Sequence, residues 1–327
     1  MVATQSEVWQ RARVVETRAL TPTIRRIVLE PALPIPVAPG AHLDTRVLIA
    51  GEVDVRSYSV VDASPDGRAL AISVFLSETS RGGGAVMHAL RPGDELEITQ
   101  PSVDFPLRIG AFRYILLAGG IGITAIASMA AVLRGLGADY ELVYAGRTRS
   151  AMAYLDDLAE LHGDRLRVHV GDEGTSLVVT DLVGSADDGT ELYMCGPIRL
   201  MDSVRRAWVV RALPLPNLRF ETFGTGGWHE PEEFRVRIPA LGLETVIGVG
   251  QSMLEALERA GADLMYDCRK GECGLCEVRV LDLEGDIDHR DVFYSERQKD
   301  ARGKLCCCVS RVVATGDRGA GVVTIEL

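Results

Sequence analysis

Short stretches in which apolar and polar residues alternate fill the first third of the chain. They include IRRIVLE, LDTRVLI, RSYSVV, LAISVFL and DELEIT, and turn-forming sequences such as APG, SPDG and RPGD separate them. A period of two is typical of strands that bury one face, and close turns join such strands in antiparallel order. We therefore expect an antiparallel β-barrel over residues 1–108, with the proline-rich EPALPIPVAPG as a loop.

The pattern changes to strand followed by helix over residues 109–226. RYILLAGG has the character of a buried strand, and Ile126, Met129, Leu133 and Leu136 follow at the spacing of one helix face. YELVYAGRT, RLRVHVGDE and ELYMCGP are further strand-like stretches. Alternating strands and helices predict a parallel sheet covered by helices.

A turn-rich linker over residues 227–233 precedes the last unit, residues 234–327. This unit begins with the strand-like FRVRIPA and ETVIGV and ends with CEVRVLD and GVVTIEL. Between them, Ser252 and Glu255 have the spacing of a capping box at the start of a helix. The combination predicts a small α+β domain that contains a cysteine-rich loop.

Length, composition and charge indicate a globular protein of two or three domains that does not bind nucleic acid. The 327 residues suggest two or three domains, and 47% hydrophobic with 25% charged residues is ordinary for globular proteins. A formal net charge of −11 argues against a nucleic-acid partner, although it can steer a basic protein partner. We recognise neither a membrane span nor a secretory leader, so we expect a cytoplasmic protein that does not bind membranes.

The cysteine-rich loop carries the strongest chemical signal. Cys268, Cys273 and Cys276 have the spacing C-x₄-C-x₂-C, which in plant-type ferredoxins holds a [2Fe–2S] cluster together with a fourth, later cysteine. Gly271 and Gly274 allow a short loop to fold around such a cluster and to turn amides toward its sulfurs. Zinc is the main alternative, but its ligands usually form two separated pairs. An odd total of seven cysteines does not fit a closed set of disulfides.

The fourth cysteine must come from the run Cys306, Cys307 and Cys308. The spacing common in plant-type ferredoxins favours Cys306, whereas the motif CVSR begins at Cys308. The remaining cysteines of the run are then small buried side chains, the usual role of a free cysteine.

Two further groups of residues, the glycine-rich turns and the RSYS motif, are candidate cofactor-binding sites. LLAGGIGIT leaves a strand and enters a helix, where free amides can bind phosphate, and MCGP follows another strand of the same unit. Each is equally well an ordinary tight turn, but parallel strands bind ligands at their carboxyl ends. In RSYS, Arg56 offers a forked charge to a phosphate and Tyr58 a flat face to a flavin ring, although the simpler alternative is a strand edge.

In combination, RSYS, RGG, GGIGIT, YMCGP, FETFG, the cysteine loop followed by DHRD, and CVSR resemble the phthalate dioxygenase reductase family, which includes vanillate O-demethylase reductases. The resemblance covers nearly the whole chain. It implies an FMN-binding β-barrel, a nicotinamide-binding α/β domain and a C-terminal β-grasp ferredoxin domain. It also implies an NADH-dependent reductase that passes electrons through FMN and a [2Fe–2S] cluster to a terminal oxygenase.

The resemblance also implies site residues. Ser59, Thr124 and Cys195 are expected beside the reacting rings. The flavin residues that it implies are Arg56, Ser57, Tyr58, Ser59, Ser73, Val74, Phe75, Arg81, Gly82, Gly83, Gly84, Thr124 and Phe223. The nicotinamide residues that it implies are Gly119, Gly120, Gly122, Cys195, Gly196 and Pro197. The motif CVSR selects Cys308 as the fourth cluster ligand, beside Cys268, Cys273 and Cys276.

Some positions depart from the family pattern. Gly84 stands where the family usually has serine, Ala125 where it usually has proline, and Phe75 where some members have a basic residue. The lost serine hydroxyl bears on the choice between FMN and FAD. Arg147 and Arg149 can meet the 2′-phosphate of NADPH, or the diphosphate or solvent; the resemblance favours NADH.

The partner is the least determined feature. A Rieske oxygenase and a haem-thiolate (cytochrome P-450) monooxygenase both fit, acting in the hydroxylation or O-demethylation of an aromatic compound, and we expect a monomeric reductase. A redox sensor that uses the same cofactors is an alternative function, but no DNA-binding or signalling segment supports it.

Overall fold

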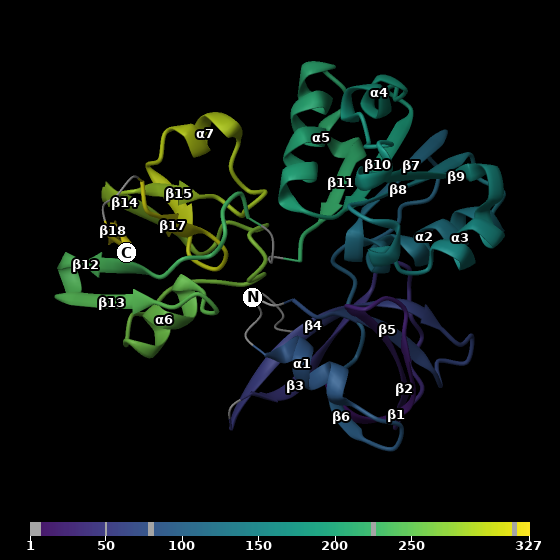
Figure 1. Ribbon diagram of the computed structural model, residues 1–327, viewed down its shortest axis with the longest axis horizontal. Coiled ribbons are helices and arrows are strands. Elements are labelled where there is room, and N and C mark those ends of the chain that lie inside the picture. Colours follow the sequence, from purple (N-terminus) through teal and green to yellow (C-terminus); the bar gives the residue numbers. More distant parts are fainter. Residues whose placement is uncertain (1–7, 50, 78–81, 224–226, 316–318) are drawn as a thin grey trace, which may run out of the picture. The chain divides into compact units, whose positions relative to one another are not determined.

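The computed structural model describes residues 8–49, 51–77, 82–223, 227–315 and 319–327. Its contacts divide the chain into two compact units, Met1–Gly196 with Ser203–Glu221, and Pro197–Asp202 with Thr222–Leu327 (Figure 1). The first unit contains the barrel and the parallel sheet together. The boundaries of three separate domains therefore stay a prediction.

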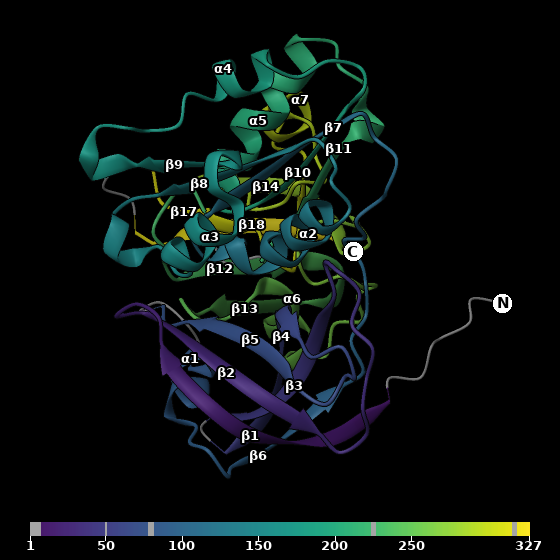
Figure 2. The same cartoon turned by 90° about the vertical axis from the view of Figure 1, so that its right-hand side faces the viewer.

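Strands β1 to β6 close an antiparallel barrel in the first unit (Figure 2). Their bounds are β1 Trp9–Ala19, β2 Ile24–Pro31, β3 His42–Ile49, β4 Glu52–Ala63, β5 Leu70–Phe75 and β6 Glu95–Thr99, and their order is β1-β2-β5-β4-β3-β6. Alternate residues such as Ile27, Leu29 and Ile72 are fully buried inside the barrel. The short helix α1 (Gly83–Ala89) lies between β5 and β6 in the chain. The barrel expected from the alternating pattern is confirmed.

The parallel sheet of the first unit has the strand order β11-β10-β7-β8-β9. The strands are β7 Arg113–Gly119, β8 Tyr140–Gly146, β9 Leu166–Val170, β10 Thr190–Cys195 and β11 Leu218–Glu221. The helices between them are α2 Ile123–Gly135, α3 Leu155–His162, α4 Val179–Gly184 and α5 Ile198–Val210. The chain proceeds from β7 to one side of the sheet and later returns to the other side. The strand order therefore reverses between β7 and β10, which is where open α/β sheets bind ligands.

The second unit contains a mixed sheet of order β13-β12-β18-β14-β16. Its strands are β12 Phe234–Ile238, β13 Leu243–Ile247, β14 Glu277–Glu284, β16 Lys304–Cys306 and β18 Gly321–Glu326, while β15 Asp286–Asp288 pairs with β17 Arg311–Val313. Helix α6 (Met253–Arg259) follows β13, and α7 (Glu296–Asp300) precedes β16. The predicted capping box is present, because Ser252 and Glu255 each accept the other's backbone N–H.

No helix in the described part of the chain combines the length and apolar character needed to cross a bilayer.

Candidate cofactor sites

The cysteine loop lies between α6 and β14, and its glycines are needed for its shape. Gly271 and Gly274 both have a φ of 76°, in the left-handed region that favours glycine. A Cβ on Gly271 would lie 2.6 Å from the Val309 side chain, and one on Gly274 would lie 2.3 Å from the Phe293 ring. Any larger residue at these two positions would push the loop away from its supports.

The Cys268 sulfur lies in a ring of hydrogen-bond donors. The backbone N–H groups of Lys270, Glu272 and Cys273 each donate to it at 3.4 Å. A hydrogen bond with the Cys308 thiol is the largest cause that lowers the pKa of Cys268 to about 4, and these amides add to it against the effect of burial. Such surroundings favour a thiolate, which is the form that binds iron.

Contacts among the thiols distinguish the members of the cysteine run. The Cys308 thiol lies close enough to Cys268 and Cys276 to lower the pKa of both, and the Cys273 N–H donates to the Cys268 sulfur at 3.4 Å. These thiols therefore form a connected row that contains the four donors a [2Fe–2S] cluster needs. No three His, Cys, Asp or Glu side chains of the described residues surround a point where a single metal ion would sit.

The other cysteines of the run have different neighbours. Cys306 is a neighbour of Cys276 and lowers the pKa of that thiol, whereas the Cys307 thiol donates to the Met253 sulfur at 3.6 Å. Within the described residues no disulfide joins any of these cysteines. The row of thiols thus fits the predicted cluster with Cys308 as its fourth member.

The DHRD motif supports the cysteine loop from outside. The Val292 N–H, directly after the motif, donates to the Gly271 carbonyl at 3.0 Å, and the backbone of Asp291 lies against Gly271. The Asp288 carboxylate accepts the Trp228 N–H at 2.8 Å and pairs with the Arg290 guanidinium at 2.7 Å. The motif therefore ties the loop and the 228–229 segment to one framework.

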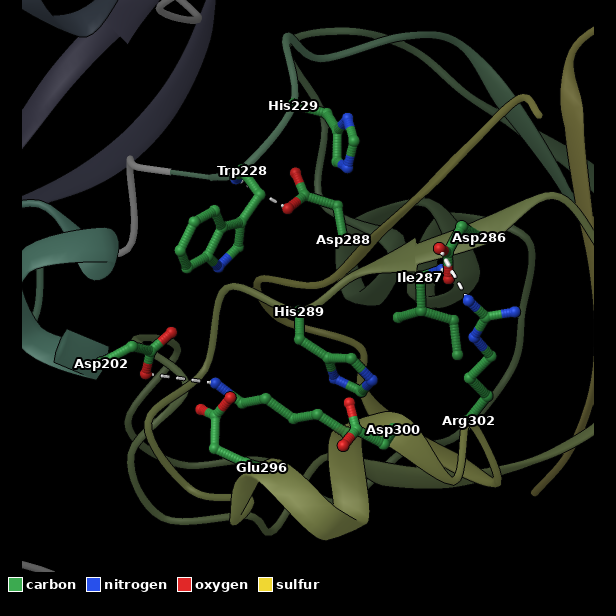
Figure 3. A pocket seen from close by; sticks show the side chains of 11 residues that line it. Asp202, Trp228, His229, Asp286, Ile287, Asp288, His289, Glu296, Asp300 and Arg302 are labelled. Carbon is green, nitrogen blue, oxygen red and sulfur yellow. Dashed lines mark hydrogen bonds and ion pairs between the residues drawn. The ribbon is translucent and has the colours of Figure 1, made fainter. Parts of the chain in front are cut away.

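Two members of this motif line a pocket of about 350 Å³ in the second unit (Figure 3). The buried His289 ring lies beside Asp291, 3.2 Å from its carboxylate, and its Nε2 has no hydrogen-bond partner among the described residues. Lys299 lies 3.4 Å from Asp202 and donates to the Asp291 carbonyl at 2.8 Å. Acidic and basic groups in this pocket largely pair with each other.

Strand β4 presents the RSYS residues next to the start of α1. The Arg56 guanidinium forms a fork with the Asp54 carboxylate, with both N–O distances at 2.6 Å. A Cβ on Gly83 would lie 3.0 Å from the Arg56 Nε, and Gly82 has a φ of 99°. Arg56 and the glycines of the predicted phosphate loop are therefore neighbours, as expected. Arg81 lies outside the described residues.

The next residues of β4 fit a ring-shaped ligand. The Ser59 hydroxyl is buried and has no hydrogen-bond partner among the described residues. Burial raises the pKa of the neighbouring Tyr58 to about 12, against the opposing effect of Arg56. A buried hydroxyl without a partner costs free energy unless a bound ligand supplies one. Ser57 is exposed and donates to Asp44 instead.

The predicted flavin strand β5 divides its residues between two faces. The Val74 side chain is buried in the barrel core, whereas Phe75 is 45% exposed. Ser73 is buried, and its hydroxyl lies 2.5 Å from that of Tyr154. Val74 can therefore face a flavin only through its backbone. Phe223 is half-buried two residues after β11, in the second unit.

The two glycine-rich turns meet at the reversal of strand order. Cys195 pairs with Ala118 in the parallel ladder of β10 and β7. A Cβ on Gly122 would lie 2.1 Å from the Cys195 carbonyl oxygen, and one on Gly196 would lie 3.0 Å from the Gly119 Cα. The structure thus brings the predicted nicotinamide residues together at the carboxyl ends of adjacent strands.

The neighbours of these turns complete the site. Gly120 has a φ of 54°, and Pro197 precedes α5 and accepts the Leu200 and Met201 amides on its carbonyl. The Thr124 hydroxyl is buried and donates to the Ile121 carbonyl at 2.9 Å. Its proton is thus already used, which leaves the lone pairs of this hydroxyl for a ligand.

Sequence reasoning missed Tyr154 and Glu272. Tyr154 has a φ of 63°, which is uncommon for a residue other than glycine. No pattern in the sequence predicts this left-handed conformation. The Glu272 carboxylate accepts the Thr222 N–H at 2.6 Å and the Thr222 hydroxyl at 2.9 Å. The sequence position of Glu272 between Cys268 and Cys273 could have indicated this contact, because a carboxylate in a cysteine loop needs a hydrogen-bond donor.

Comparison with known proteins agrees with this geometry. Residues 239–313 match the 2Fe-2S iron-sulfur cluster binding domain family, and residues 116–206 match the oxidoreductase NAD-binding domain family. A carnitine monooxygenase reductase subunit from Acinetobacter pittii is 32% identical over 273 residues, which cover 83% of this chain and 88% of that protein.

Two solved structures match nearly the whole of this chain. One is phthalate dioxygenase reductase, described as a modular structure for electron transfer from pyridine nucleotides to [2Fe-2S]. It is 28% identical, with a TM-score of 0.72 and 98% of each chain covered. The other is an intact type IV self-sufficient cytochrome P450 monooxygenase, 33% identical with a TM-score of 0.65. The match covers 98% of this chain but only 41% of that longer one.

Proposed function

Because the chain belongs to the phthalate dioxygenase reductase family, we propose that it passes electrons from NADH through FMN and a [2Fe–2S] cluster to a terminal oxygenase. It is an oxidoreductase and the reductase component of an oxygenase system. The observation that carries the proposal is the cysteine loop of the second unit, in which three backbone N–H groups donate to the Cys268 sulfur at 3.4 Å.

The first unit would hold the flavin and the nicotinamide. FMN, when bound, accepts a hydride and releases its electrons one at a time, as a one-electron cluster requires. Gly82–Gly84 would bind the FMN phosphate, and the neighbouring Arg56 would join them by exchanging its pairing with Asp54 for the phosphate. The partnerless Ser59 hydroxyl would hydrogen-bond to the flavin ring. The Tyr58 ring would lie against the flavin and exclude water, which its burial supports.

The meeting of the two glycine turns would position the nicotinamide. Gly122 and Gly196 leave the backbone bare, so that a dinucleotide can approach the amides of both turns. Cys195 and Thr124, both buried at this point, would fix the face of the nicotinamide ring that is turned to the flavin. Positioning of this kind is worth large factors in rate without any acid–base group.

NADH rather than NADPH is the electron donor that we assign. Arg149, which could meet a 2′-phosphate, already forms a fork with Glu173, at 2.7 and 2.6 Å. A carboxylate beside the ribose disfavours a further phosphate by like-charge repulsion.

Cys268, Cys273, Cys276 and Cys308 would hold the cluster, with the amides of the loop donating to Cys268. We assign residues 1–108 to the FMN domain, 109–226 to the NAD domain and 234–327 to the ferredoxin domain. The location is cytoplasmic, because a reducing compartment keeps the cluster thiols from forming disulfides.

The partner is a separate terminal oxygenase, of Rieske or cytochrome P-450 type, acting on an aromatic compound, and the reductase itself is a monomer. The likeness to the P450 chain covers only 41% of that protein, so it supports the reductase part alone.

An anaerobic titration with NADH, followed by visible absorbance of the purified protein, tests the proposal. We expect the flavin bands and the broad cluster absorption to bleach together, with uptake of two electrons for the flavin and one for the cluster. A colourless protein, or one whose colour does not respond to NADH, would overturn the reductase function.

A further inference from the structure

Tyr154 joins the barrel to the α/β part of the first unit through a side-chain hydrogen bond to Ser73. We propose that Tyr154 is a positioning residue for hydride transfer, because this bond holds the barrel, which would carry the flavin, in place against the sheet, which would carry the nicotinamide. The inference rests on the proposed function, since it takes the flavin on the barrel and the nicotinamide at the two glycine-rich turns.

Strand alternation points the Ser73 side chain to the outside of the barrel. Ile72 and Val74, its neighbours in β5, both pack in the barrel core, so the residue between them faces the other way. Ser73 is nevertheless only 5% exposed, and its hydroxyl lies 2.5 Å from the Tyr154 hydroxyl. The Tyr154 side chain therefore reaches the outer face of the barrel and forms a hydrogen bond there.

The Tyr154 backbone adopts a conformation that is unusual for a tyrosine. Its φ of 63° and ψ of 11° lie in the left-handed region, directly before α3, and its side chain forms no capping hydrogen bond to that helix. Glycine would adopt this conformation at a lower free energy, so the start of the helix does not explain a tyrosine here. A strained backbone of this kind indicates that the side chain itself has a role.

The segment before Tyr154 is anchored at the carboxyl end of β8. A Cβ on Gly146, the last residue of β8, would lie 2.5 Å from the buried Met152 side chain. Strand β8 pairs with β7, with Ala145 opposite Gly119 at the point where the first glycine-rich turn begins. Tyr154 is thus fixed relative to the edge of the sheet where the nicotinamide would lie.

The barrel part meets the α/β part at a second point as well. The Gly40 N–H donates to the Ser128 hydroxyl of α2 at 3.4 Å, and a Cβ on Gly40 would lie 2.7 Å from the Met129 side chain. A single attachment leaves two bodies free to rotate about it, whereas a second attachment restricts that rotation. Because hydride transfer depends on the alignment of the two rings, loss of the Tyr154 hydroxyl should slow it without removing a group that binds either cofactor.

The experiment uses the full-length protein with its cofactors. Stopped-flow reduction of the flavin at rising NADH concentrations gives the limiting rate and the apparent Kd for NADH separately. We expect Tyr154→Phe, which keeps the ring, to lower the limiting rate roughly 3- to 10-fold, the equivalent of one hydrogen bond, with the Kd for NADH and the bound FMN unchanged. Ser73→Ala should lower the rate similarly, and the double variant no further, because all three lack the same bond.

Tyr140→Phe is the matched control. Tyr140 is a buried residue of β8, and its hydroxyl lies 2.6 Å from the Nδ1 of His162 at the end of α3. This hydrogen bond lies wholly within the α/β part, so its loss removes a tyrosine hydroxyl from the same sheet without a link to the barrel. We expect the limiting rate of this variant to match that of the parent protein, and thermal unfolding of each variant reports any general loss of stability.

Several outcomes would overturn the inference. An unchanged limiting rate in Tyr154→Phe would deny this tyrosine a positioning role, and equal slowing in Tyr140→Phe would indicate a general effect of stability. Additive losses in the double variant would show that the Tyr154 and Ser73 hydroxyls act independently. If Tyr154→Phe does not fold, Ser73→Ala tests the same bond against Tyr140→Phe. A parent protein whose bound flavin is not reduced by NADH would instead reject the proposed function.

Discussion

Gly122 packs directly on the carbonyl group of Cys195, so closely that a Cβ on the glycine would lie 2.1 Å from the carbonyl oxygen. The contact joins the turn after β7 to the turn after β10. These strands are neighbours in a parallel sheet, and the order of the sheet reverses between them. The proposed nicotinamide site therefore depends on the absence of a side chain at Gly122.

We expect Gly122→Ala to slow the reduction of the flavin by NADH about 100-fold, because a displacement of about 1 Å in a reacting pair can cost that much. Bound flavin and iron should stay at the levels of the parent protein. Stopped-flow absorbance measures the rate. Gly135→Ala is the matched control, since a Cβ there meets nothing within 4 Å among the described residues and alanine favours the helix. Equal rates in the two variants would contradict the assignment.

The Cys308→Ser variant should lose the cluster and keep the reduction of flavin by NADH. Cys308 lies near Cys268 and Cys276 and lowers the pKa of both thiols, so its loss removes the proposed fourth ligand beside them. Most of the predicted flavin and nicotinamide residues lie in the first unit and need not change; only Phe223 and Pro197 belong to the second unit with Cys308. Iron content, EPR and the bleaching of the flavin bands report both steps. Cluster loss in Cys306→Ser, together with its retention in Cys308→Ser, would show that the ligand choice is wrong.

The Arg56→Ala variant should bind FMN more weakly. A charge-assisted hydrogen bond contributes about 1.5–3 kcal/mol, which corresponds to about a 10- to 100-fold higher dissociation constant. Fluorescence titration of the deflavinated protein measures it. Arg46→Ala removes another barrel arginine, which pairs with Glu97 at 2.8 Å and stacks on Trp9 at 4.1 Å. If Arg56→Ala holds flavin as firmly as Arg46→Ala does, Arg56 has no role at the phosphate.

Local spacing explains how much of this site was predictable. The cysteine loop and the glycine turns are short, and their chemistry is contained within a few consecutive residues. The alternating and helical periods likewise predicted the barrel, the parallel sheet and the capping box of Ser252 and Glu255. In each case the pattern along the chain is itself the physical cause of the structure.

Contacts between distant residues were not predictable in this way. The hydrogen bond between Tyr154 and Ser73 joins residues 81 positions apart and depends on a left-handed backbone at Tyr154. Sequence spacing alone did not decide whether Cys306 or Cys308 is the fourth cluster ligand, because their surroundings depend on the register of β16 on β14. Motif matching also gave no sign that the Val74 side chain is buried in the barrel core.

The ion pair between Arg149 and Glu173 bears on the choice between NADH and NADPH. Arg149 and Glu173 follow the adjacent parallel strands β8 and β9, at the edge where the nucleotide is expected. Their side chains form a two-pronged pair, which lowers the pKa of Glu173 and keeps it charged. While this carboxylate is present, the positive charge of Arg149 is balanced and a 2′-phosphate meets repulsion.

The Glu173→Gln variant should therefore raise the ratio of kcat/KM for NADPH to that for NADH several-fold. Glutamine keeps the size of the side chain but removes the negative charge, so Arg149 becomes available to the 2′-phosphate. The gain should fall as salt is added, because both side chains are solvent-exposed and salt screens such charges. Glu97→Gln removes a carboxylate from an arginine pair in the barrel and should leave the ratio unchanged. An unchanged ratio in Glu173→Gln would mean that this arginine lies away from the ribose.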